Sequence, residues 1–139
     1  MDFTRRDALI LGAGAATVAL LPVQAFASGD SEAIAAFTGG AATSEGGIDL
    51  TAPEIAENGN TVPVAVSAPG AVSIILLAAG NPNPDVCTFN FGPLSGSQSA
   101  STRIRLAGTQ EVIAIAKMAD GSFVQTSSIV KVTIGGCGG

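Results

Sequence analysis

The chain of 139 residues contains no histidine, no tryptophan and no tyrosine, so phenylalanine is its only aromatic residue. Without histidine it cannot form a Ser-His-Asp or Cys-His catalytic site, an HExxH zinc site, a Cys/His zinc finger or a CxxCH haem attachment site. Histidine is also the side chain whose ordinary pKa suits proton transfer near neutral pH. We therefore expect any chemistry to depend on a cysteine or to be supplied by a partner protein.

Charged residues are also scarce, at 12% of the chain, and acidic side chains outnumber basic ones by 11 to 6. The resulting net charge of −5 argues against nucleic-acid binding, which requires clustered lysine and arginine. Hydrophobic residues make up 47% of the sequence, too large a share for an intrinsically disordered chain. The length allows one domain.

The N-terminal segment has the organisation of an export signal. A short charged stretch precedes an apolar run that is shorter than the roughly 20 residues needed to span a bilayer. Ala25 and Ala27 form an A-x-A cleavage signature, so residues 1–27 are expected to be removed. Arg5 and Arg6 resemble the twin-arginine export signal, with an ordinary secretory signal as the alternative. The prediction is a periplasmic protein with no membrane segment after cleavage.

Residues 28–134 predict a domain built mainly from β-strands. A short helix is expected over residues 31–37, where a serine N-cap precedes apolar residues at helical spacing. Beyond residue 61 the sequence alternates between apolar and polar residues at the period of a strand. Expected strand segments lie at 48–50, 62–66, 72–79, 87–91, 102–106, 112–118 and 124–134, with Val130, Val132 and Ile134 facing inward. Short strands at this spacing predict an immunoglobulin-like β-sandwich.

The segment Val72–Ala79 is almost entirely apolar, as expected of a central strand covered on both faces. The alternative is an edge-exposed strand covered by a partner subunit, since an obligate interface resembles a divided core. Residues 80–84 predict a break in the chain, and Asp120-Gly121 predicts a hairpin turn.

Arg103 and Arg105 are expected side by side on the outward face of their strand. They either increase solubility or form a docking patch for a partner. Lys131, outward on the last strand, is a further cation that is expected near the C-terminal segment.

The chain ends on a cysteine, Cys137, with two glycines on each side: Gly135, Gly136, Gly138 and Gly139. Because glycine lacks Cβ, residues 135–139 are expected to form a thin, flexible arm that reaches about 10 Å beyond the domain. Such an arm suits delivery of a thiol into a narrow active site of another protein. No neighbouring cation is placed to lower the pKa of this thiol, so activation is expected from the docked partner.

The second cysteine, Cys87, shares a strand face with Phe89 and Phe91 and is expected to be a buried, unpaired thiol. The alternatives are a resolving thiol that pairs with Cys137 and an intermolecular bridge.

The terminal Gly-Gly-Cys-Gly-Gly, together with segments 81–84, 101–106 and 130–134, resembles the SoxY family of sulfur carriers from the thiosulfate-oxidising system. The resemblance implies an immunoglobulin-like fold, a heterodimer with SoxZ, and Cys137 as the covalent attachment site for thiosulfate-derived intermediates. It also implies three transient partners: the c-type cytochrome SoxAX, the dimanganese hydrolase SoxB and the sulfane dehydrogenase SoxCD. The carrier itself is then not an enzyme and has no cofactor and no metal.

Two other functions stay open at this point. A thiol-disulfide redox protein would use Cys87 and Cys137, but the chain lacks a CxxC motif and a βαβ pattern. A non-catalytic immunoglobulin-like interaction module would leave the glycine-flanked thiol without a role.

Overall fold

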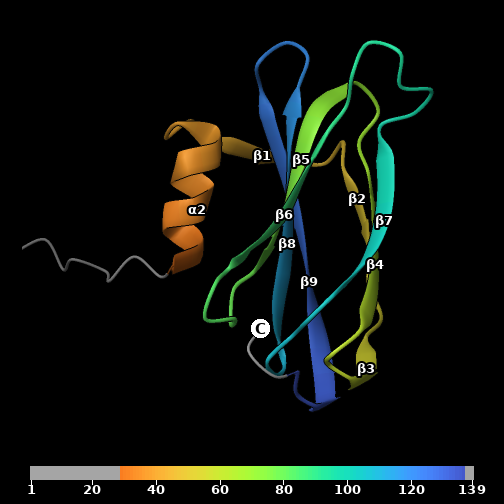
Figure 1. The fold of residues 1–139 in the computed structure, drawn as a ribbon. Coiled ribbons are helices and arrows are strands. Elements are labelled where there is room, and N and C mark those ends of the chain that lie inside the picture. Colours follow the sequence, from red (N-terminus) through yellow and green to blue (C-terminus); the bar gives the residue numbers. More distant parts are fainter. Residues whose placement is uncertain (1–28, 137–139) are drawn as a thin grey trace, which may run out of the picture.

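The computed structural model describes residues 29–136, with side chains from residue 31 onward. The predicted export signal, with Ala25 and Ala27, lies outside the described residues, as do Cys137, Gly138 and Gly139. One helix, α2 (Gly29–Thr38), precedes the strands β1 (Thr43–Glu45), β2 (Asp49–Thr51), β3 (Ile55–Asn58), β4 (Val62–Ser67), β5 (Ala71–Ala78), β6 (Asp85–Asn90), β7 (Ser99–Ile104), β8 (Gln110–Met118) and β9 (Phe123–Ile134). This order confirms the predicted all-β domain with a short N-terminal helix (Figure 1).

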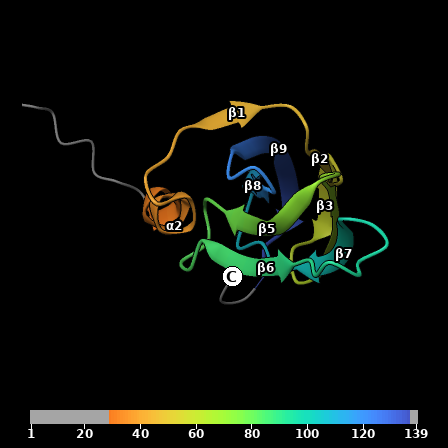
Figure 2. The same ribbon diagram turned by 90° about the horizontal axis from the view of Figure 1, so that it is seen from above.

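The strands form two sheets that pack face to face (Figures 1 and 2). The larger, six-stranded sheet has the order β1-β9-β8-β5-β6, with β3 also pairing with β9, and the smaller sheet has the order β2-β4-β7. Strands β1 and β3 run parallel to β9, whereas the other pairs are antiparallel. Two packed sheets with these connections make the predicted immunoglobulin-like sandwich.

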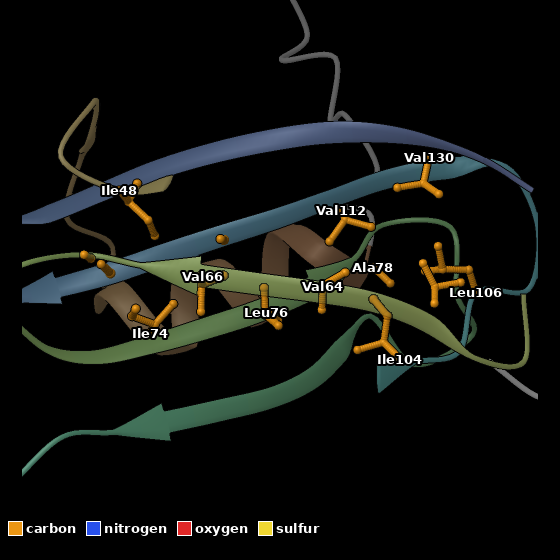
Figure 3. Packing of buried hydrophobic residues seen from close by; sticks show 14 of the residues in the cluster. Ile48, Val64, Val66, Ile74, Leu76, Ala78, Ile104, Leu106, Val112 and Val130 are labelled. Atoms are coloured by element: carbon orange, nitrogen blue, oxygen red, sulfur yellow. The ribbon is translucent and has the colours of Figure 1, made fainter. Parts of the chain in front are cut away.

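The main core lies between the two sheets and is built from alternate residues of their strands (Figure 3). The predicted alternation of Val62, Val64 and Val66 is confirmed, since all three are buried on the inner face of β4. They pack in one cluster with side chains of β5, β7, β8 and β9, among them Ile74, Leu76, Ala78, Ile104, Val112 and Val130. Burial of these apolar side chains is the main force that holds the sheets together.

Strand β5 is covered on both faces, as its apolar sequence predicts. Leu76 faces the smaller sheet, whereas Leu77 faces the opposite side, where it packs in a second cluster beneath α2. There the ring of Phe37 on α2 meets that of Phe123 on β9 edge to face, with centroids 5.8 Å apart. The alternative of an edge strand covered by a partner is wrong, because β5 lies between β6 and β8.

Differences from the sequence prediction lie at strand ends and in short polar strands. Ile134 is 66% exposed rather than inward, because β9 continues past Val130, its last residue paired with β8, and is joined there only by β3. Arg105 lies in the loop after β7, which ends at Ile104, so it does not share a strand with Arg103. Strands β1 and β3 have no counterpart in the prediction, since neither contains an alternating apolar pattern.

Candidate functional site

Three chain segments meet at the end of β9, where the cysteine-bearing segment begins. The amide of Gly136 donates a hydrogen bond of 2.8 Å to the carbonyl oxygen of Leu106, in the loop after β7. The amide of Leu106 donates one of 2.8 Å to the carbonyl oxygen of Gly59, in the turn after β3. The amide of Gly59 in turn donates one of 2.7 Å to the carbonyl oxygen of Ile134. The base of the cysteine-bearing segment is therefore bonded to two separate loops.

The backbones approach so closely here that side chains do not fit. A Cβ on Gly136 would lie 2.8 Å from the carbonyl oxygen of Gly59, and a Cβ on Gly135 would overlap the carbonyl oxygen of Ala107. A Cβ on Gly59 would overlap the carbonyl oxygen of Leu106. Two of the four glycines that are predicted to give the arm its freedom are thus packed against the domain. The rest of the predicted arm, with Cys137, lies outside the described residues.

The loop after β7 is itself held by two buried polar side chains, Asn81 and Gln110, which are 6% and 8% exposed. The Asn81 side chain donates to the carbonyl oxygen of Arg105 at 2.8 Å and accepts from the amide of Ala107 at 2.9 Å. It also accepts from Nε2 of Gln110 at 2.8 Å. Sequence reasoning assigned Asn81 to a chain break and to a segment of the family resemblance, gave it no role at this site, and did not single out Gln110. A polar residue at an inward position of the β8 alternation was the available signal for Gln110.

Cys87 lies on β6 at the edge of the larger sheet, opposite Leu76 on β5. Its side chain is half-buried and packs against the main core with Phe89, which is less complete burial than predicted. It is a free thiol. Burial, followed by the nearby charge of Asp85, raises the pKa of Cys87, so its thiolate is disfavoured.

The three cations singled out in the sequence belong to β7, to the loop after β7 and to β9. Arg103 is exposed on the outer face of β7, where it lines an open groove of about 530 Å³ with small and hydroxyl-bearing residues such as Ala65 and Ser101. Arg105 is exposed in the next loop, and Lys131 is exposed on β9, beside Ile55 of β3. Arg103 and Arg105 therefore do not form the predicted pair on one strand.

Among residues 29–136, no three His, Cys, Asp or Glu side chains gather closely enough to hold a metal ion. The one helix in this part of the chain is not long and apolar enough to cross a membrane.

Comparison with protein families gives one match that covers most of the chain. The family described as "Sulfur oxidation protein SoxY" matches residues 34–137, a range that extends to Cys137. No curated protein matches the chain significantly.

Solved structures provide a second comparison. The sulfur carrier protein SoxY from Chlorobium limicola f thiosulfatophilum is 37% identical, with a TM-score of 0.68, over 78% of this chain and 99% of that one. A superoxide reductase (neelaredoxin) from Ignicoccus hospitalis is similar in fold alone, at 17% identity and a TM-score of 0.56 over 64% of this chain and 82% of that one.

Proposed function

Since the chain belongs to the SoxY family of sulfur oxidation proteins, we propose that it carries thiosulfate-derived sulfur covalently on Cys137. Family membership supports a carrier role in sulfur oxidation rather than a catalytic one. The observation that carries the proposal is the family match over residues 34–137, together with 37% identity to a sulfur carrier. The glycine-flanked thiol at the end of that match is the natural attachment point.

The proposed loading step is an oxidative coupling. The Cys137 thiol loses its proton, its sulfur forms a bond to the sulfane sulfur of thiosulfate, and two electrons pass to a c-type cytochrome, SoxAX. The product is a cysteine S-thiosulfonate. Hydrolysis by the dimanganese enzyme SoxB then adds water across the terminal S–S bond, which releases sulfate and leaves a persulfide on Cys137. The sulfane dehydrogenase SoxCD is the proposed oxidant of that remaining sulfur.

The proposal includes the setting in which these steps occur. SoxZ is the expected partner in a heterodimer, and the periplasm is the expected compartment. The protein reaches it through the twin-arginine pathway and then loses residues 1–27. The carrier needs no cofactor of its own in this scheme, because oxidation and hydrolysis are assigned to its partners. The raised pKa of Cys87 supports the choice of Cys137, since an attacking thiol benefits from a lowered pKa.

The test is intact-protein mass spectrometry, with and without reductant, on protein purified from cells grown on thiosulfate. We expect reducible sulfur adducts on the C-terminal peptide, and their absence from the Cys137→Ser variant. The matched Cys87→Ser variant should carry the same adducts and support the same thiosulfate-dependent activity with the partner proteins. If both substitutions abolish activity, the thiol-disulfide redox function is favoured, and if neither does, the interaction module is favoured.

A further inference from the structure

Leu106 is the hydrogen-bond partner of Gly136, the last described residue before Cys137. Its side chain is fully buried in the main core, while its amide and carbonyl groups bond to Gly59 and Gly136 at 2.8 Å each. The position of Gly136 therefore depends on the position of the Leu106 backbone.

The Asn81 side chain forms hydrogen bonds with the loop on both sides of Leu106. It bonds the carbonyl group of Arg105 on one side and the amide of Ala107 on the other. A single amide side chain satisfies both groups only while the backbone between them keeps its present path. Asn81 thus fixes the segment that receives Gly136.

Gln110 holds Asn81 in turn. Its Nε2 donates to Asn81 Oδ1 at 2.8 Å and to the carbonyl oxygen of Gly108 at 3.0 Å, and its Oε1 accepts from the amide of Gly80 at 2.9 Å. The turn before β6, the loop after β7 and the start of β8 are therefore joined in one buried network. Buried polar groups that are hydrogen-bonded in this way favour a single arrangement of the chain.

We infer that Asn81 and Gln110 are positioning residues for the sulfur-bearing end of the protein. Acting through Leu106, they set where Gly136 is held, and Gly136 immediately precedes Cys137 in the sequence. This inference rests on the proposed function, because it concerns the presentation of Cys137 to the loading enzyme. It also explains why residue 135 must be glycine, since a Cβ there would overlap the carbonyl oxygen of Ala107 in the same loop.

The test compares two variants. Asn81→Ala removes the two hydrogen bonds to the loop after β7. Gly135→Ala displaces residues 135 and 136 from that loop and leaves the side chains of the network in place. Amide hydrogen exchange by NMR in the full mature protein reports on Gly136, and both variants should raise its exchange rate about tenfold. Thr43→Ala is the matched control, because it removes a side-chain bond of 2.7 Å to Gln125 near the opposite end of β9. Gly92→Ala is the second control, since a Cβ at Gly92 has no atom within 4 Å. Both controls should leave Gly136 protected.

Loading of Cys137 by the cytochrome partner is the second readout, with the carrier as the varied substrate in a Cys87→Ser background. Asn81→Ala and Gly135→Ala should raise KM about tenfold, with kcat and the rate of alkylation by iodoacetamide unchanged, as expected for loss of presentation. If Asn81→Ala keeps Gly136 protected, or is loaded with an equal or lower KM, the inference is overturned. If Asn81→Ala does not fold, Gln110→Ala, which removes the hydrogen bond to Asn81 Oδ1, decides by the same two readouts. Failure of the unsubstituted protein to be loaded would instead overturn the proposed function, and the exchange of Gly136 would still decide whether the network holds the segment.

Discussion

Of the two cysteines in this chain, Cys87 is the one whose surroundings the structure describes. It packs with Phe89 against the main core, and the carboxylate of Asp85 lies nearby. Burial and this charge both disfavour the thiolate, so its pKa is raised above the ordinary value. A thiol of this kind contributes to packing as a small apolar side chain.

The prediction for this residue concerns its alkylation rate as a function of pH, measured with iodoacetamide on a Cys137→Ser variant. The midpoint of the rate profile should lie above the ordinary thiol value of about 8.5, and it should return to about that value when the same protein is unfolded in urea. Because folding raises this pKa, the thiol's contribution to stability is present below the unfolded pKa and is lost as the pH rises through the folded pKa. A folded midpoint below the unfolded one would contradict this description and favour a redox role for Cys87.

At the scale of elements, helix α2 covers part of the outer face of the larger sheet. That sheet therefore buries apolar side chains on both of its faces. Ala33, Ile34 and Phe37 contact the cluster formed by β5, β8 and β9. The helix ends at Thr38, whose hydroxyl donates to the carbonyl oxygen of Ile34 at 2.9 Å, before Gly39 takes a positive φ of 65°. The second core is therefore smaller than the one between the sheets and depends on a single helix.

Two substitutions should separate the contributions of these cores to the free energy of unfolding. Leu76→Ala, at a fully buried site between the sheets, should cost about 3 kcal/mol, since it leaves a cavity. Phe37→Ala should cost about 2 kcal/mol, because the ring is half-buried and loses its contact with Phe123. Glu32→Gln, on the exposed side of α2, should stay within about 0.5 kcal/mol of the unsubstituted protein. Urea unfolding measures all three, and an equal effect of Phe37→Ala and Glu32→Gln would show that the helix contributes no packing energy.

The sequence predicts the parts of these elements that depend on local periodicity. Alternation in 62–66 and the apolar run of 72–79 indicate β4 and β5 correctly, because each strand face has a distinct environment. Strands β1 and β3 are formed by parallel pairing with β9, residues far away in sequence, and no local pattern encodes that pairing.

In the candidate site, too, local sequence features can be predicted, whereas contacts between distant segments cannot. The glycines and Cys137 are visible in the sequence as a composition, and they lead directly to the family. The role of Asn81 is not visible in the sequence, because its hydrogen-bond partners, Arg105 and Ala107, lie close to it only when the two sheets are packed. An asparagine before proline is equally consistent with an exposed turn.

At the scale of the whole molecule, the two ends of the sandwich carry different segments of the chain (Figure 1). One end carries Ile134 and the anchored Gly136. The other end carries the loop between β6 and β7, where Leu94 is 99% exposed. That loop lies near Phe123, at the end of β9 opposite Ile134. The amide of Phe91, where the loop begins, donates a hydrogen bond to the carbonyl oxygen of Val72 at the start of β5. The start of β5 pairs with the end of β8, and that end of β8 pairs with Phe123. Under the proposed function, an enzyme that loads Cys137 approaches the first end, because the described part of the chain ends there at Gly136.

This difference predicts unequal effects of two substitutions that change the charge equally. Ile134→Asp should lower kcat/KM for loading by the cytochrome partner about tenfold, corresponding to roughly 1.4 kcal/mol, because it places a charge where the enzyme contacts the domain. Leu94→Asp should leave kcat/KM within about twofold, although it replaces a more exposed apolar side chain with the same charge. Both sites are solvent-exposed, so neither variant should alter the urea midpoint appreciably, and the comparison reports on docking. Equal effects of the two variants would mean that a general repulsion, set by the net charge of −5, governs the encounter rather than contact at the anchored end.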